Sequence, residues 1–309
     1  MNAWYYGNLL TIQTTLTALL LALSIQIPMR MGVFAFTGVG AFGIAGYSTT
    51  ILVADHGLGA IPAIIVSAIA AGLICLLWAL LVYRLNGLYL AMSTFAFTLI
   101  VSVVAVNGGT VTGGPSGRYG VITPFGMGAI VTISSIGLVA AALTERGRMG
   151  RRIDAVRDDP QLATSLGVSV RRYRLWGFAA SGLFGGTAGA MQVLIRTTIT
   201  PTDIGFHLIV LALTIVVIGG LRSWTGALLG AIVFTWLPQL LTSASEWRDL
   251  IYGGVILIAA VVAPGGVHGV VTGWLRGRQR RRRAASGAAL PAKIEATEDL
   301  GEQMAQARQ

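Results

Sequence analysis

The chain has 309 residues, of which 54% are hydrophobic and only 11% are charged. A soluble domain needs far more charged surface, so this composition excludes an ordinary soluble protein and indicates a polytopic membrane protein. The net charge of +10 comes from arginines that cluster outside the apolar runs. Such clusters are typical of charges that orient a membrane protein, and they argue against nucleic-acid binding.

A transmembrane helix needs roughly 20 apolar residues. By that length the sequence contains about nine candidate spans, with roughly eight to ten possible. The nine lie at residues 9–28, 33–54, 60–83, 87–106, 126–143, 174–195, 206–221, 225–242 and 249–264. We therefore predict an all-α fold, a polytopic transmembrane helical bundle, in a domain at residues 1–275.

A polar island interrupts the apolar runs between Thr144 and Arg174, with eight arginines and four acidic residues. A charged segment of this length cannot lie in hydrocarbon, so we predict a cytoplasmic loop at residues 144–173. With nine spans, the same side also receives Arg30, Arg84, Arg222 and the run Arg276–Arg283. This asymmetry predicts an external N-terminus and a basic, disordered cytoplasmic tail at residues 276–309.

The sequence lacks the residues that membrane enzymes use. His56, His207 and His268 are far apart and form no metal-ligating motif, and Cys75 is the only cysteine. We therefore predict no catalytic residue, no metal site and no cofactor in this chain. No ionisable side chain lies clearly inside a span, whereas ion-coupled transporters usually keep one there. The energy for transport is expected to come from outside the membrane region.

Two motifs follow each other in the chain. The first reads Tyr83-Arg-Leu-Asn-Gly-Leu-Tyr-Leu-Ala-Met-Ser-Thr-Phe-Ala-Phe97, and the second reads Thr112-Gly-Gly-Pro-Ser-Gly117. They resemble the Arg-Leu-x-Gly-x-Tyr-x-Ala-Met segment and the Thr-Gly-Gly-x-x-Gly loop of the branched-chain amino-acid permease family of ATP-binding-cassette (ABC) importers, in particular its second membrane subunit. The resemblance extends over about residues 15–270. It implies the fold of a type II ABC importer permease.

Shorter stretches agree with this resemblance, namely Phe42–Tyr47, Gly219–Gly230 and Val262–Gly266. Some positions depart from the family pattern. Val39 stands where the family commonly has histidine, Arg222 replaces a turn glycine and Ala227 replaces a proline. These departures bear on the solute more than on the transporter class, because the family at large also handles amides, urea and other small polar solutes.

The polar island is similar to the loop in which ABC permeases place a short coupling helix against the ATPase subunit. Asp158 and Asp159 suit a helix N-terminus, and Pro160 suits a first helical turn. Gly167 suits the helix end, so we expect a helix of about two turns. The coupling residues that the resemblance implies are Arg157, Asp158, Asp159, Pro160, Gln161, Ala163 and Gly167.

The span at residues 87–106 is the expected wall of the solute pathway, although hydroxyls in membrane helices often bond their own backbone. The pathway candidates are Tyr89, Met92, Ser93, Thr94 and Thr98. The outer-loop motif comprises Thr112, Gly113, Gly114, Pro115 and Gly117. Glycines at small-x-x-x-small spacing predict close helix packing, with helix sliding as the alternative interpretation. They include Gly182, Gly185, Gly186 and Gly189.

The resemblance implies a membrane-spanning permease subunit of an ABC importer for branched-chain amino acids or related small polar solutes. Such a subunit is not an enzyme, and it lies in the bacterial cytoplasmic (inner) membrane. The expected partners are a homologous permease subunit, two cytoplasmic subunits that bind ATP and Mg²⁺, an extracytoplasmic solute-binding protein and membrane lipid, with no nucleic acid. The alternative is a stand-alone facilitator or channel for small solutes that is not coupled to ATP.

Overall fold

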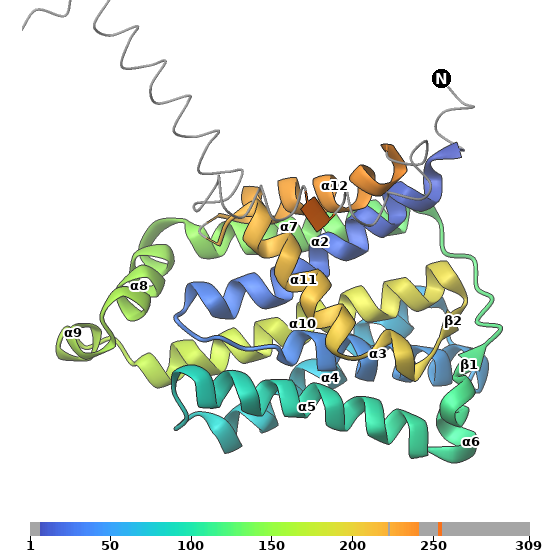
Figure 1. Ribbon diagram of the computed structural model, residues 1–309, viewed down its shortest axis with the longest axis horizontal. Helices are drawn as coiled ribbons and strands as arrows, with labels where there is room; N and C mark the ends of the chain where they lie inside the picture. The colour runs from blue at the N-terminus through green and yellow to red at the C-terminus, as the bar shows by residue number, and fades with distance from the viewer. Residues whose placement is uncertain (1–6, 222, 241–252, 255–309) are drawn as a thin grey trace, which may run out of the picture. The chain divides into compact units, whose positions relative to one another are not determined.

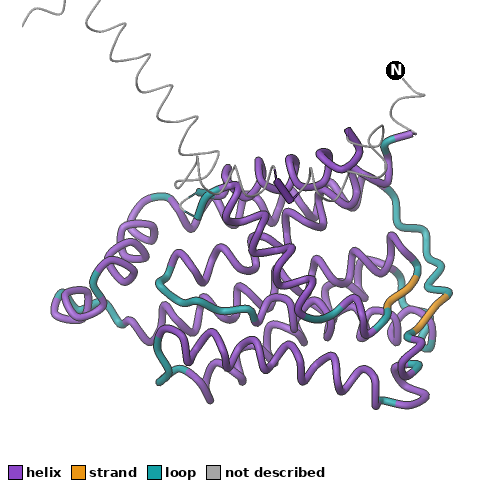
Figure 2. Tube along the Cα trace, in the orientation of Figure 1, coloured by secondary structure: helices purple, strands orange, loops and turns teal. Residues whose placement is uncertain are grey.

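The computed structural model describes residues 7–221, 223–240 and 253–254. Helices dominate the fold, and the two strands are short (Figures 1 and 2). The first part of the chain forms α2 (Leu9–Arg30), α3 (Thr37–Ala54), α4 (Ala60–Val82), α5 (Gly87–Asn107), α6 (Gly109–Thr112), the 3₁₀ turn η1 (Gly114–Ser116) and β1 (Arg118–Tyr119). The second part forms α7 (Met127–Glu145), α8 (Gly147–Asp158), α9 (Pro160–Ser165), α10 (Val170–Arg196), β2 (Thr198–Ile199), η2 (Pro201–Asp203), α11 (Phe206–Gly219) and α12 (Trp224–Leu240).

Among the described residues, seven helical segments are long and apolar enough to cross a membrane. They are α2, α3, α4, α5, α7, α10 and the segment Pro201–Gly219, and they coincide with the first seven predicted spans. The predicted span 225–242 corresponds to α12, which has only 17 residues. The predicted span 249–264 and the tail at 276–309 lie outside the described residues, except for 253–254. The all-α bundle is confirmed, and the count of nine spans stays a prediction.

The bundle has two ends, with α8 and α9 at one and α6, β1 and β2 at the other (Figure 1). The arginine-rich end holds α8 and α9, together with Arg30, which pairs with Glu145 at 3.2 Å, and Tyr83, whose ring lies 4.5 Å from the Arg171 guanidinium. The outer-loop end holds α6, η1, η2 and the antiparallel pair of β1 with β2. The side of the membrane that each end faces stays a prediction from the positive-inside rule.

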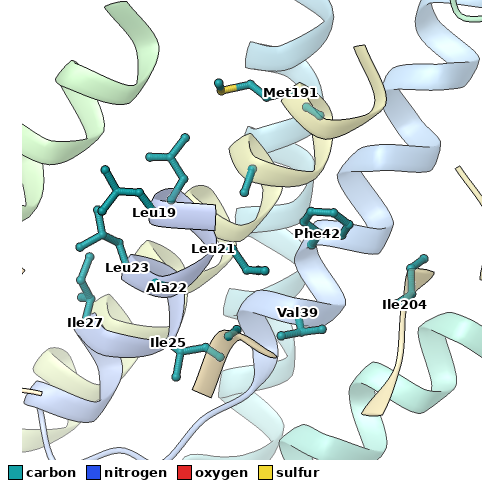
Figure 3. Packing of buried hydrophobic residues seen from close by; sticks show 14 of the residues in the cluster. Leu19, Leu21, Ala22, Leu23, Ile25, Ile27, Val39, Phe42, Met191 and Ile204 are labelled. Carbon is teal, nitrogen blue, oxygen red and sulfur yellow. The ribbon is translucent and has the colours of Figure 1, made fainter. Parts of the chain in front are cut away.

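Helix α10 is the central element, because it packs against α2, α3 and α4. Its glycines allow this contact. A Cβ atom on Gly185 would lie 2.1 Å from the Gly38 carbonyl oxygen of α3, and one on Gly182 would lie 2.8 Å from the Gly72 Cα of α4. The small-x-x-x-small spacing therefore brings backbones together, as close-packed membrane helices require. Figure 3 shows the adjoining core, where apolar side chains of α2 meet Val39 and Phe42 of α3 and Met191 of α10.

The connection between α2 and α3 is partly buried, and its Phe34 is 45% exposed. We predicted a helical span from residue 33, but α3 begins at Thr37, and the preceding residues are not helical. Val33 and Ala35 in this connection are fully buried. A buried non-helical backbone needs hydrogen-bond partners from elsewhere in the protein. The residues that supply these partners belong to the predicted pathway wall.

Candidate functional site

The coupling segment, residues 146–169, connects α7 to α10 and contains two helices. The shorter helix, α9, is capped by Asp159, whose Oδ1 accepts hydrogen bonds from the backbone N–H groups of Gln161 at 2.9 Å and Leu162 at 3.0 Å. Pro160 occupies the first helical turn, where its missing N–H costs nothing. The local sequence therefore fixes where α9 begins.

Gly167 ends α9 in the left-handed conformation, with a φ of +80°. Its N–H donates to the Thr164 carbonyl, and the Val168 N–H donates to the Ala163 carbonyl at 2.9 Å. This pattern is the one that closes helices at glycine. Ala163 is buried beneath the helix, whereas Leu162 and Leu166 are 58% and 70% exposed. The helix is thus held firmly while it presents two leucines to the surroundings.

The predicted helix from Asp158 to Gly167 needs a correction. Asp158 ends the preceding helix α8, and its carboxylate accepts hydrogen bonds from Arg157 instead of capping α9. We also treated the residues before Asp158 as loop, but α8 is a helix of 12 residues with Ile153 and Val156 buried. The coupling segment is therefore a pair of helices, because α8 has an apolar face that packs against the bundle.

A polar junction joins α2, α7 and α12 where α7 meets the coupling segment. Arg30 at the end of α2 pairs with Glu145 at the end of α7, and Ser223 donates to Glu145 Oε2 at 3.2 Å. The backbone N–H of Trp224, at the start of α12, donates to Glu145 Oε1. Our sequence reasoning did not single out this junction. A signal for it was present in the sequence. Arg30 and Glu145 carry opposite charges, and they follow the first and the fifth predicted span on the same predicted side of the membrane.

A cavity of about 460 Å³ lies between α2, α3, α10, α11 and α12. Thr17 and Gln192 are joined across it by a hydrogen bond of 3.0 Å from the Thr17 hydroxyl to Gln192 Oε1. Arg196 and Asp203 line it at the outer-loop end. The remaining lining residues are Thr14, Ala18, Leu21, Phe42, Val193, Thr198, Ile199, Thr202, His207, Leu208, Leu211, Phe234, Thr235 and Pro238. Half of all the lining residues are apolar, and the other half carry hydroxyl, amide, imidazole or charged groups.

The predicted pathway residues of α5 do not line this cavity. Tyr89 and Met92 lie exposed on the helix surface, and Ser93 is half-buried. Thr94 and Thr98 are fully buried, and both bond Phe36 just before α3. Their hydroxyls therefore provide partners for the non-helical connection described above. The role of this span as a pathway wall stays a prediction.

The outer-loop motif spans the end of α6, where Thr112 lies, and the turn η1, which contains Gly114 and Pro115, with Gly113 between them. Gly117 has a φ of +74°, and a Cβ atom there would lie 2.2 Å from the Ile199 carbonyl oxygen of β2. No other residue type fits this close approach. The motif therefore packs directly against β2, in the connection between α10 and α11, and Ile199 of β2 also lines the cavity.

The same loop is tied to the α3–α4 connection by a surface ion pair. Arg118 Nη1 donates to Asp55 Oδ2 at 2.9 Å, and its second terminal nitrogen donates to Oδ1. The hydrogen bonds and positive charge of Arg118 lower the pKa of the Asp55 carboxyl below its ordinary value.

Among the residues that the structure describes, no cluster of histidine, cysteine and acidic side chains could hold a metal ion.

Comparison with known proteins assigns the chain to a family. Residues 8–261 match the model of the family described as branched-chain amino acid transport system / permease component. The chain belongs to this permease family. The resemblance found in the sequence is confirmed, and the chain is a multi-pass membrane transport subunit and not an enzyme. Permeases of ABC importers work with ATPase subunits and a partner permease.

Individual relatives of this permease are similar over different lengths. It is 27% identical to the high-affinity branched-chain amino acid transport system permease protein LivM of Escherichia coli (strain K12), over 82% of this chain and 68% of LivM. It is 29% identical to the probable branched-chain amino acid transport permease protein LivH of Methanocaldococcus jannaschii, over 46% of each chain. It is also 28% identical to the autoinducer 2 import system permease protein LsrC of Enterobacter sp., over 49% of this chain and 45% of LsrC. No solved structure matches the chain.

Proposed function

We propose that this permease forms part of the translocation pathway of an ABC importer for branched-chain amino acids or related small polar solutes. It acts in a bacterial cytoplasmic membrane, beside a homologous permease subunit. Two cytoplasmic subunits bind ATP and Mg²⁺, so this chain needs no cofactor of its own. An extracytoplasmic solute-binding protein delivers the solute to the outer-loop end.

The observation that carries this proposal is the geometry of α9. A helix of six residues is capped at both ends, and it presents Leu162 and Leu166 outward at the arginine-rich end. These side chains are four positions apart and share one face of the helix. A rigid, apolar face on a polar segment suits a groove on a soluble partner better than it suits water. We assign this partner as the ATPase subunit.

The cavity supports the proposed solute class. Its volume of about 460 Å³ falls within the roughly 300–1,000 Å³ that small-molecule sites span. Leu21, Phe42 and Leu211 offer apolar surface for an aliphatic side chain. Arg196 and Asp203, at the outer-loop end, carry the two charge signs that a zwitterion requires. A branched-chain amino acid combines these features.

One experiment tests the energy source. The permease is purified in mild detergent with its candidate partner subunits, the complex is placed in proteoliposomes, and leucine uptake is measured with ATP, with ADP and without the ATPase subunits. We expect copurification of the ATPase and uptake only with ATP. Uptake down a gradient by the permease alone supports the facilitator instead. A panel of leucine, valine, an aliphatic amide, urea and autoinducer 2 then ranks the solutes.

A second experiment tests the role of α9. Replacing Leu162 and Leu166 by alanine removes the exposed apolar side chains and keeps the backbone hydrogen bonds of both caps. We expect weaker binding of the ATPase and reduced uptake. Thr164→Ala is the matched control, because Thr164 lies on the same helix and its side chain bonds only the Pro160 carbonyl. Equal ATPase binding by both variants would contradict the assignment.

A further inference from the structure

Glu145 is bonded to three separate elements at the arginine-rich end. Its carboxylate pairs with Arg30 of α2 at 3.2 Å, and the two side chains are only 7% and 17% exposed. The same carboxylate accepts from the Ser223 hydroxyl in the α11–α12 connection and from the Trp224 N–H at the start of α12. A carboxylate at a helix N-terminus is also favoured by the helix dipole.

The α11–α12 connection is bonded to α2 at a second point. Gln26 of α2 is buried, and its Nε2 donates to the Gly220 carbonyl at 2.9 Å and to the Ser223 carbonyl at 2.8 Å. The Glu145 carboxylate and the Gln26 amide therefore both hydrogen-bond the α11–α12 connection. The ends of α2 and α12 are joined here into one polar unit.

The coupling segment rests on the backbone of Glu145. Helix α8 begins two residues after Glu145, and a Cβ atom on Gly150 of α8 would lie 2.3 Å from the Glu145 carbonyl oxygen. Near the other end of α8, Arg157 packs against Gly32, just beyond α2. A displacement of α8 by a partner that holds α9 therefore displaces Glu145 as well.

The elements bonded to Glu145 are also walls of the cavity. Helix α2 contributes Thr17 and Leu21, and α12 contributes Phe234 and Thr235. Helix α7 packs mainly against α2 and meets α12 only over a short stretch, so the Glu145 bonds are a principal link between α7 and α12. A buried ion pair is weak evidence for stability alone, but it suits a contact that fixes the register of moving elements.

We propose that Glu145 is a positioning residue that couples the movement of α8 and α9 to α2 and α12, and thereby to the shape of the cavity. This proposal rests on the proposed function, because it requires an ATPase that moves the coupling segment. Glu145 is not among the residues that line the cavity. It transmits displacement through the Arg30 ion pair and through the bonds to Ser223 and Trp224.

The test uses the complete transporter in proteoliposomes and compares Glu145→Gln with the unsubstituted protein. We expect assembly and ATP hydrolysis within about twofold of the unsubstituted complex, while solute imported per ATP falls at least about fivefold, which corresponds to the lower end of typical coupling free energies between two sites. Asp154→Asn is the matched control. It also removes one carboxylate charge, but from α8 and from a side chain that is 53% exposed. We expect this control to import as much solute per ATP as the unsubstituted complex.

A distance measurement separates coupling from simple stabilisation. Cys75 is buried, so spin labels are placed at Ile232→Cys on α12 and Val104→Cys on α5, which are both exposed. We expect ATP to change this distance in the otherwise unsubstituted complex and not in Glu145→Gln. Should Glu145→Gln fail to fold, Ser223→Ala removes one bond from the junction, keeps the ion pair and is expected to give a smaller loss of the ratio.

Several results would overturn the proposal. One is that Glu145→Gln imports as much solute per ATP as the unsubstituted complex. Another is that ATP hydrolysis and uptake fall together because the complex is lost. A third is that Asp154→Asn lowers solute import per ATP as much as Glu145→Gln does. A retained ATP-dependent distance change in Glu145→Gln would overturn it as well. If the unsubstituted complex shows no ATP-dependent uptake, it is the proposed function that fails, and the two failures are therefore distinguishable.

Discussion

The Thr94 hydroxyl accepts a hydrogen bond of 3.1 Å from the backbone N–H of Phe36. Phe36 is the last non-helical residue before α3, and its N–H has no helical partner. Thr98, one turn further along α5, donates to the Phe36 carbonyl at 3.3 Å. A pair of threonines on one helix thus completes the hydrogen bonding of a break in another.

Thr94→Val is expected to destabilise the permease by about 0.5–1.5 kcal/mol, because it removes the hydrogen-bond partner of the partly buried Phe36 N–H. Valine keeps the shape of threonine, so packing changes little. Thermal unfolding in detergent measures the loss. Thr94→Ser is the control, since it retains the hydroxyl, and a serine variant as unstable as the valine variant would show that the hydrogen bond is not responsible.

Gly117→Ala is expected to disrupt the outer-loop end. The added Cβ atom would lie 2.2 Å from the Ile199 carbonyl oxygen, and the φ of +74° disfavours alanine independently. Limited proteolysis of the loop in proteoliposomes should become faster, and uptake should fall. Gly126→Ala is the matched control, because nothing lies within 4 Å of its added Cβ atom. Equal sensitivity of both variants to protease would contradict this account.

Asp159→Ala is expected to cost α9 about 1 kcal/mol through loss of its N-cap. The Asp159 carboxylate accepts hydrogen bonds from the backbone amides of Gln161 and Leu162. Hydrogen exchange of these two amides should therefore become faster in the variant. Asp159→Asn should be nearly neutral because asparagine caps equally well. Asp158→Ala should have little effect on these amides, since that side chain pairs only with Arg157 at the surface. Faster exchange in Asp158→Ala than in Asp159→Ala would refute the assignment of the cap.

The Asp55–Arg118 ion pair predicts an acid-sensitive outer loop. The pKa of Asp55 is lowered in the folded protein, so its contribution is complete above the ordinary aspartate pKa and is lost as the pH falls through the lowered value. Amide hydrogen exchange near Arg118 measures this, once the rates are corrected for the intrinsic pH dependence of exchange. Protection of these amides should be lost only below the ordinary pKa of aspartate. Asp55→Asn should remove the pH dependence. A transition near neutral pH would exclude this pair as its cause.

The spans could be predicted from the sequence because apolar length is a local property. The start of α9 was predicted in part: Asp159 and Pro160 begin the helix, but Asp158, which we also placed at its N-terminus, ends α8. The start of α3 was placed four residues too early, at residue 33 instead of Thr37. The reason is physical: the break is stabilised by Thr94, which lies 58 residues away from Phe36 in the chain.

Helix α8 was missed for a different reason. Its many arginines hid a short apolar face, in which Gly150, Ile153 and Val156 recur at a spacing of three residues and are buried. Such periodicity indicates a helix even when the mean hydropathy is low. The cavity could not be predicted from the sequence, because its walls come from five helices and the α10–α11 connection, which are far apart in the chain.

The break before α3 also constrains how the protein is made. When Phe36 leaves the ribosome, the residue that will bind its N–H still lies 58 positions from completion. Hydrocarbon offers no substitute partner for an open backbone amide. The Phe36 N–H thus lacks this partner until α5 is made, so we expect the α2–α3 pair to stay beside the insertion machinery or water until then. Biogenesis of this permease is expected to release α2, α3, α4 and α5 as one unit rather than one at a time.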